Sequence, residues 1–426
     1  MKKSSVLIVA YFIVAIMVIL AVALLYTLST ESALVRQRER SLQAFYLAEA
    51  GIDYGIREVK VNGITSMNYT QSLGPGSFSV NISEVSLDRV RVEATGMVES
   101  VTKTVQTYLR PDVFARYAYF TDSETFLQKV CSWYGCYWTS TDVWFTSTSY
   151  IDGPVYTNSH YNISGSPVFD GEVKSHDDYI NYYHGGPPQD TPQFNEGIEL
   201  GAPEMPMPTN ASDLRTAASS ADGLYLNGKT LVVLNSDGTI SITNSSRGWY
   251  NHNEPIPPNG AVFVEGGDLY VRGSLDGMLS LGTDSNIIIT NNISYVDDPR
   301  DDTPTTESDD MLALISEQNV IVSTDDDDGS SVYDETAPYD VRIDATIMAL
   351  GNSFVVENWD TVSPKGTLNV YGGIIQKNRG PVGTFSGSTK ISGYSKDYRY
   401  DTRLDHITPP YYPRTGDWAF LSWRKG

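Results

Sequence analysis

The stretch AFYLAEAG, residues 44–51, decides the first part of the fold, because it joins an apolar segment to the polar chain that follows. It is too polar to extend the apolar segment, and its Ala, Leu and Glu residues favour a helix over a flexible linker. No Pro or Gly occurs between Val6 and Ala50. We therefore predict one continuous helix from about Val6 to about Val61, with a length of roughly 80 Å.

The first half of this helix is apolar on all sides. The segment from Val6 to Leu28 has 23 residues and no charge. As a helix it would extend about 35 Å, which exceeds the roughly 30 Å hydrocarbon core of a bilayer. It is longer than the apolar region of a cleaved signal peptide, about 7–15 residues, so we expect it to be retained. Basic residues flank it on both sides and do not fix its orientation.

The second half of the helix is amphipathic. Apolar residues recur at steps of three or four, which places them on one face that is suited to dock onto a globular domain. These residues are Leu42, Phe45, Ala48, Ile52, Ile56 and Val59. The small residues Ala44, Ala48, Ala50 and Gly51 would also let another chain approach closely.

This N-terminal region resembles the PilX-type minor pilins and pseudopilins of type IV filament systems. The resemblance rests on the basic start MKKS, the apolar segment and QAFYLAEAGIDYGI, and it covers about sixty residues. It implies that a dedicated peptidase cuts between Ser4 and Ser5, that the helix packs in a filament core, and that a head is carried outside. The implied assembly residues are Val9, Leu42, Phe45, Ala48, Glu49, Gly51, Ile52 and Ile56.

Two residues depart from the pattern of this family. Ser4 stands where prepilins have Gly, and Val9 stands where major pilins have Glu as the fifth mature residue. In the family that Glu is thought to set the register between neighbouring subunits. Its absence favours a minor subunit, for example at a tip, over a major one. If the leader is kept, the helix would instead be a plain single-pass anchor.

The remainder of the chain is expected to be rich in β-structure, so that the fold class is α+β. Alternation at residues 78–82 and 90–94 predicts an antiparallel meander. The predicted divisions are a leader (1–4), the long helix (5–61), the meander (63–110), a first β-rich region with a Pro-rich crossover (111–250) and a second β-rich region (251–426).

Short repeats suggest the architecture of the β-rich part. IDGPVYT at Ile151 recurs as FDGEVKS at Phe169, eighteen residues later. Short apolar couplets follow one another through residues 261–293, separated by Gly, Asp and Asn. Closely spaced strands and turns of this kind suit a β-solenoid, in which each coil stacks on the next. A β-sandwich or an irregular β fold is the alternative.

The charge of the chain limits its partners. The net charge is −22, and the window from Asp297 to Glu335 holds 14 acids and one base. Such a surface repels nucleic acid and favours cations or basic partners. The run Asp325, Asp326, Asp327 and Asp328 offers oxygen ligands for calcium, although it lacks the spacing of an EF-hand and is otherwise a solvated loop.

Residues 131–145 form the richest aromatic stretch. Cys131 and Cys136 are the two cysteines of the chain, and they either close a small disulfide loop or remain free thiols. Trp133, Tyr134, Tyr137 and Trp138 follow or lie within that loop. If exposed, they would bind a glycan or a protein surface; otherwise they would pack between the meander and the β-rich part.

Signals of catalysis or of other metal sites are weak. His176 and His184 have no standard zinc spacing. The chain contains no nucleophile elbow, metalloprotease helix or phosphate loop. We therefore expect a non-enzymatic protein without a cofactor, apart from possible calcium.

A second resemblance is carried by the segment that runs from GGIIQKNRGPVGTF to PPYYP. It covers roughly the last 170 residues, which are similar to the C-terminal part of an uncharacterised domain family often found after PilX-type N-termini. The combined prediction is a pilin-like or pseudopilin-like subunit. It would reside in the inner membrane before assembly and at the cell surface afterwards, with other pilin-like subunits as partners. The alternative is an envelope-anchored surface or adhesion protein outside any filament.

Overall fold

A computed structural model describes residues 3–86, 89–133, 135–300, 308–325, 333, 335–386 and 389–425. The chain divides into two compact units, one made of residues 1–112 with 416–426 and the other of residues 113–415. The second unit is therefore inserted into the sequence of the first. This differs from the division predicted at residue 250, because residues on both sides of that position belong to one unit.

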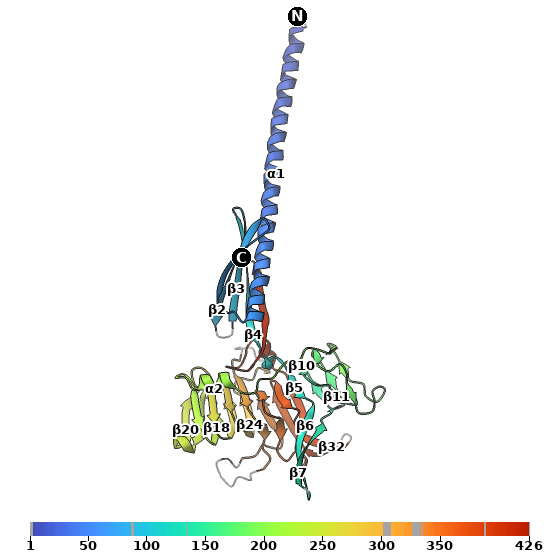
Figure 1. The fold of residues 1–426 in the computed structure, drawn as a ribbon, viewed down its shortest axis with the longest axis vertical. Coiled ribbons are helices and arrows are strands. Elements are labelled where there is room, and N and C mark those ends of the chain that lie inside the picture. Colours follow the sequence, from blue (N-terminus) through green and yellow to red (C-terminus); the bar gives the residue numbers. More distant parts are fainter. Residues whose placement is uncertain are drawn as a thin grey trace. The chain divides into compact units, whose positions relative to one another are not determined.

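The first unit combines a long helix with an antiparallel sheet (Figure 1). The helix α1 packs on strands β2 and β3, as the predicted meander requires. Gly63, with φ of +65°, adopts the left-handed conformation that commonly follows a helix end. The elements, with strands in spatial order, are α1 (Lys3–Asn62), β1 (Met67–Leu73), β2 (Gly76–Ser86), β3 (Arg89–Val98), β4 (Val101–Val113) and β35 (Arg414–Lys425).

The face of α1 that packs on the sheet is narrower than the apolar face predicted from the sequence. Leu42 was expected on that face, but it is 53% exposed. The face consists of residues spaced three and four apart, and it includes glycines that a count of apolar residues misses. Its members are Ala44, Leu47, Ala48, Gly51, Ile52, Gly55 and Val59. The sheet of the same chain therefore packs against Ala44, Ala48 and Gly51. We had expected these small residues to allow the close approach of another chain.

The second unit contains two long ladders of parallel strands (Figure 1). In the first ladder every neighbouring pair of strands is parallel. In spatial order its strands are β16 (Ile198–Leu200), β13 (Val173–Ser175), β10 (Val155–Thr157), β5 (Tyr119–Ser123), β31 (Ile374–Asn378), β28 (Thr346–Ala349), β25 (Met311–Ser316), β23 (Met278–Thr283), β21 (Ala261–Glu265) and β17 (Leu224–Asn227).

The second ladder runs in the same order and ends in an antiparallel extension. Its strands are β15 (Gln193–Phe194), β12 (Val168–Phe169), β9 (Tyr150–Ile151), β34 (Ser395–Arg399), β30 (Thr367–Tyr371), β27 (Val341–Asp344), β24 (Ile287–Tyr295), β22 (Leu269–Leu275), β18 (Thr230–Leu234), β19 (Thr239–Asn244) and β20 (Trp249–Pro255). In addition, β26 (Val320–Val322) pairs with β24, and β29 (Phe354–Val356) pairs with β26.

Smaller elements complete this unit. β8 (Phe145–Thr146), β11 (Asn162–Ser164) and β14 (Asn181–Tyr182) form a short parallel sheet, and two antiparallel hairpins project from the ladders. The hairpins are β6 (Thr125–Ser132) with β7 (Gly135–Asp142) and β32 (Gly383–Ser386) with β33 (Thr389–Gly393). The helices are α2 (Ser212–Ala218), η1 (Phe114–Arg116), η2 (Ser245–Arg247) and η3 (Thr402–Asp405).

The repeat seen in the sequence corresponds to one pass of the chain along the ladders. Ile151 pairs with Phe169, and Val155 pairs with Val173, so the two repeat copies are neighbours in register. The apolar couplets supply the core between the ladders, and all are fully buried: Val262, Val264, Leu269, Val271, Leu279, Leu281, Ile287 and Ile289. Burial of a side chain of this size stabilises a fold by about 1.5–3 kcal/mol.

The chain enters the ladders in the middle. It proceeds outward from β5 through β10 and β13 to β16, and residues 201–223 then cross to β17 at the opposite end. From β17 it returns strand by strand to β31, which pairs with β5. We call this β5–β31 pairing the seam. The seam joins an early pass of the chain to a late one. The two ends of the inserted unit also meet, because the Phe114 backbone N–H donates to the Pro413 carbonyl at 3.2 Å.

Candidate functional site

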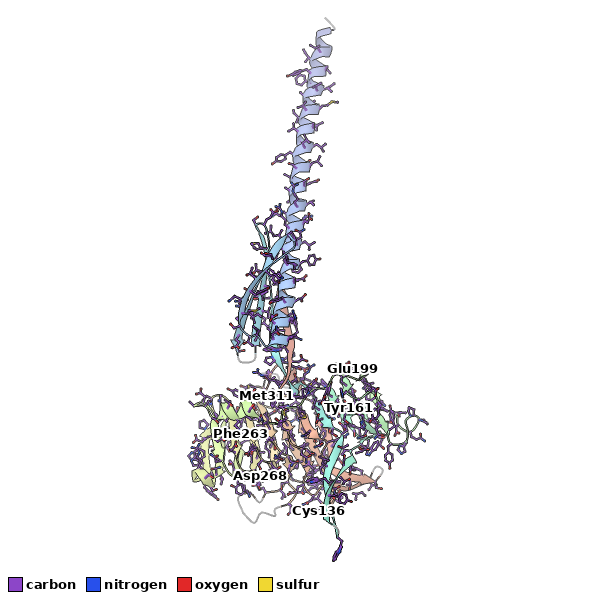
Figure 2. The ribbon with its side chains drawn as sticks, viewed as in Figure 1. Cys136, Tyr161, Glu199, Phe263, Asp268 and Met311 are labelled. Atoms are coloured by element: carbon purple, nitrogen blue, oxygen red, sulfur yellow. The ribbon has the colours of Figure 1, made fainter. Side chains whose placement is uncertain are left out.

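The apolar half of α1 is one candidate functional surface. It is the helix, among the described residues, that is long and apolar enough to cross a membrane, with a mean hydropathy of 3.2 in a window that is 0% buried. Figure 2 shows its side chains projecting from the helix on all sides. Val9 lies in this half and is 55% exposed. The expected cleavage residues Ser4 and Ser5 lie in the first turns of α1.

The remaining assembly residues predicted from the sequence lie in the packed half of α1. Ala48 and Ile52 are buried, with exposed fractions of 0% and 4%, and Gly51 is also buried. Phe45, Glu49 and Ile56 are half-buried at the edges of the packed face. These residues therefore position the sheet on the helix, and the apolar half is the part left uncovered.

The β6–β7 hairpin carries exposed aromatic rings, and we call it the aromatic hairpin. The exposed fractions of Trp133, Tyr137 and Trp138 are 98%, 57% and 67%. These rings do not pack in the interior, which was the alternative to surface binding. Phe145, from the same aromatic stretch, is instead buried in the core. Tyr134 lies outside the described residues.

The two cysteines lie near the tip of the aromatic hairpin. Cys131 and Cys136 are opposite each other in the register of β6 and β7. Cys136 is disulfide-bonded and is labelled in Figure 2.

The acidic residues do not form a metal centre in the described part of the chain. Asp325 accepts a hydrogen bond from Asn358 at 3.3 Å, and the other predicted calcium ligands, Asp326 to Asp328, lie outside the described residues. Asp298 pairs with two arginines. Among the described residues, no group of three or more His, Cys, Asp or Glu side chains is arranged to hold a metal ion.

His176 and His184, considered for zinc, have separate partners. The His176 ring is hydrogen-bonded to the Ala202 carbonyl at 2.9 Å. The His184 ring contacts the buried carboxylate of Asp190, also at 2.9 Å. Each imidazole therefore has a local structural partner.

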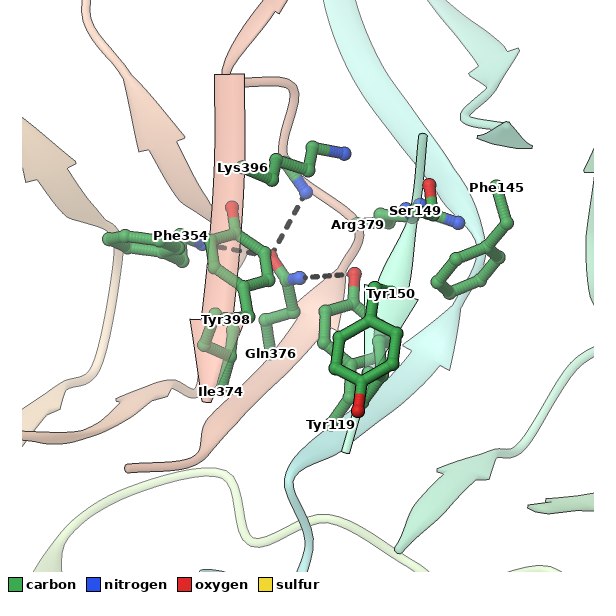
Figure 3. Close-up of a pocket in the computed structure, with 12 residues that line it drawn as sticks. Tyr119, Phe145, Ser149, Tyr150, Phe354, Ile374, Gln376, Arg379, Lys396 and Tyr398 are labelled. Carbon is green, nitrogen blue, oxygen red and sulfur yellow. Dashed lines mark hydrogen bonds between the residues drawn. The ribbon is translucent and has the colours of Figure 1, made fainter. Parts of the chain in front are cut away.

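A buried polar cluster lies at the seam, and the sequence analysis missed it. Arg379 follows β31 and is 2% exposed; its Nη1 donates to the Glu124 carboxylate at 2.7 Å, and Glu124 is fully buried. The guanidinium lies 3.5 Å above the Phe145 ring centroid. Gln376 donates to the Tyr119 hydroxyl at 2.9 Å, and Figure 3 shows both residues at this pocket. The cluster links the two passes of the chain that meet here.

Lys396 stands beside this cluster at a core position. In the β30–β34 register it is paired with Leu368, whereas Tyr398 is paired with Val370, so a lysine occupies a place that is apolar in the preceding pass. Burial and the neighbouring Arg379 guanidinium lower the pKa of Lys396 to about 7, although Glu124 opposes the change. The Lys396 ammonium forms no hydrogen bond or ion pair with any residue that the structure describes.

Lys396 and Ser149 line two adjoining spaces. The inner one, at the seam, has a volume of about 20 Å³. The outer one measures about 400 Å³, and we call it the aromatic cavity. Four aromatic side chains line the aromatic cavity: Phe126, Trp144, Trp359 and Phe385. Its polar lining includes Gln128, Thr141, Thr146, Thr148 and Ser149, and its charged lining is Asp142, Lys390 and Lys396.

The chain is similar to one protein family over part of its length and to a solved pilin structure. A family model described as a domain of unknown function (DUF4900) matches residues 84–177. That match lies outside the last 170 residues, so the domain resemblance predicted there remains a prediction. No curated protein matches the chain. The crystal structure of the competence-associated pilin ComZ from Thermus thermophilus is similar with 12% identity and a TM-score of 0.31, covering 91% of this chain and 97% of that one.

Proposed function

We propose that the protein is a minor pilin-like or pseudopilin-like structural subunit of a type IV filament system, without enzymatic activity. The single observation that carries this proposal is the two-part helix α1. Its first half is apolar and uncovered, and its second half is packed against an antiparallel sheet. Such a helix suits insertion in a membrane and then in a filament core, while a head is held at its other end.

The inserted unit would be the part presented outside. We propose that it is a β-solenoid, which is supported by two parallel ladders with the same strand order and by the eighteen-residue pairing of Ile151 with Phe169. Parallel strands stacked with a shared apolar core are the defining feature of such folds. The proposed location is the inner membrane before assembly and the cell surface or an extracellular filament afterwards, with other pilin-like subunits as partners.

Mass spectrometry of the mature N-terminus, on protein from cells that make the filament system, tests this function. We expect a terminus at Ser5, because the resemblance to PilX-type proteins places the cut between Ser4 and Ser5. Deleting the peptidase should restore the leader and remove the protein from sheared filaments. An intact leader in wild-type cells would instead favour the second candidate, a single-pass anchored surface protein.

Surface adhesion is a second proposed role, which is favoured by the exposed rings of the aromatic hairpin. Replacing Trp133 and Trp138 with Ala should weaken attachment to the target surface at least about 10-fold, since exposed tryptophans often dominate binding energy. The matched control is Tyr250→Ala, which removes a 75% exposed ring from β20. Adhesion of cells carrying each variant provides the measurement. Equal attachment of the double variant and the control would rule out this role for the hairpin.

A further inference from the structure

The aromatic cavity has the composition of a ligand site. Its volume of about 400 Å³ falls in the range of roughly 300–1,000 Å³ that is typical of small-molecule pockets. Such pockets combine apolar and aromatic walls with a few polar groups that orient the ligand. All residues that line the cavity belong to the inserted unit. The site is therefore independent of whether α1 enters a filament.

The walls of the cavity favour a ring that carries many hydroxyl groups. Phe126 and Trp359 form an edge-to-face pair with their ring centroids 5.8 Å apart, and Trp144 and Phe385 add further aromatic surface. Aromatic faces pack well against the C–H faces of a pyranose ring. The amide of Gln128 and the hydroxyls of Thr141 and Thr148 can both donate and accept, as sugar hydroxyls require.

Lys396 favours a ligand that carries a negative charge. Lys390 already donates to the Gly366 carbonyl at 2.7 Å and to the Ser395 hydroxyl at 3.0 Å, so its hydrogen bonds are directed to the protein. Lys396 has no such partner among the described residues, and it lines the cavity from a position that is apolar in the previous pass. The Lys396 side chain is half-buried, and an incoming carboxylate would supply a partner for its ammonium.

Among the described residues that line the cavity, Asp142 is the one with an acidic side chain. Asp142 ends strand β7, and its carboxylate lies 3.5 Å from the side-chain amide of Asn181. When Lys396 is protonated, as pairing with a carboxylate would favour, two lysines and one aspartate leave the lining cationic, in a chain whose net charge is −22. A local reversal of sign in an acidic protein concentrates anions at that place.

We propose that the aromatic cavity binds an acidic sugar, a hexuronic acid residue of a polysaccharide. The pyranose ring packs on Trp359 and Trp144, and its carboxylate pairs with the Lys396 ammonium. The base of the aromatic hairpin contributes Phe126 and Gln128 to the same cavity. A longer acidic glycan would therefore extend from the cavity toward the exposed rings of the hairpin.

The test is binding of free sugars to the detergent-solubilised full chain, measured by saturation-transfer NMR and calorimetry. We expect glucuronate to bind, with the strongest transfer at its ring protons, and glucose to bind at least 10-fold more weakly. Lys396→Met should reduce glucuronate affinity at least 10-fold. Lys377→Met, which removes an exposed lysine from β31, should leave it unchanged.

A second variant separates binding from folding. Trp359→Ala removes aromatic surface without touching the lysine, and it should also reduce glucuronate binding while the melting temperature of the protein stays near that of the wild type. Three results would overturn the proposal: no glucuronate binding at millimolar concentration, equal binding by Lys396→Met and wild type, or inorganic phosphate competing as effectively as glucuronate. The last result would indicate a simple anion site.

Discussion

Replacing Glu124 with Ala is expected to destabilise the inserted unit by about 3–5 kcal/mol, the largest effect of any single substitution we predict there. The change leaves the Arg379 guanidinium charged and without its carboxylate partner, at a place where Arg379 is only 2% exposed. Its remaining hydrogen bonds go to the backbone carbonyls of Val143 and Trp144, at 3.1 Å and 3.3 Å. Neutral carbonyls cannot compensate for the loss of an opposite charge in a dry environment.

The matched control is an ion pair elsewhere in the same ladder. Glu172 contacts Lys174 at 3.0 Å, and both side chains are substantially exposed. Glu172→Ala should change stability by at most about 1 kcal/mol, because exposed pairs contribute little. The measurement is thermal or urea unfolding of the full chain in detergent, with hydrogen exchange of β5 and β31 as the local readout. Equal melting of the two variants would contradict the assigned role of the seam pair.

A double variant distinguishes loss of a pair from loss of packing. Glu124→Leu combined with Arg379→Met removes both charges and keeps apolar volume, so it should recover much of the stability lost in Glu124→Ala. The two groups belong to passes of the chain separated by more than two hundred residues. We infer that the pair also selects the register of the seam, since a one-residue shift of β31 against β5 would part it. Slower refolding of the double variant is the expected sign of that role.

The ladders were predictable from the sequence to the extent that they are local. The repeat copies at Ile151 and Phe169 indicate that one pass of the chain along the ladders takes eighteen residues. The apolar couplets identify the core. The seam left no such signal. Strands β5 and β31 lie far apart in the sequence and do not share a repeat. Arg379 lies within the turn-like stretch KNRGPVG, which predicts a residue on the surface. A buried ion pair of this kind can be recognised only once the pairing of β5 with β31 is known.

The same reasoning explains the outcome for α1. Its length and apolar half follow from composition, and these parts of the prediction are confirmed. The orientation of its packed half was wrong at Leu42, because periodicity was counted over large apolar residues. The sheet instead packs on the helix where its side chains are smallest, at Ala44, Ala48 and Gly51. A pattern of small residues at steps of three and four was the available signal.

Substitution of Gly96 with Ala is expected to have the second large effect, a loss of at least about 3 kcal/mol from the first unit, at the upper end for an overpacked site. Gly96 lies in β3, where an added Cβ atom would be 2.0 Å from the Ala44 carbonyl oxygen and 2.5 Å from the Ala48 amide nitrogen. Both obstacles are backbone atoms of α1. The helix must therefore move as a body away from the sheet, and no side-chain rotation can relieve the contact.

The adjacent residue supplies the control, and the helix supplies the readout. Met97 is 46% exposed, so Met97→Ala should change stability by no more than about 0.5 kcal/mol. In Gly96→Ala, amide hydrogens of residues 44–59 should exchange faster, because the face that buries them has been lifted from β3. Adding Ala48→Gly should not restore protection, since the obstacle is the helix backbone itself. Full protection in Gly96→Ala would show that α1 and β3 are less closely packed than their geometry indicates, and the helix would then be a poorer support for the sheet.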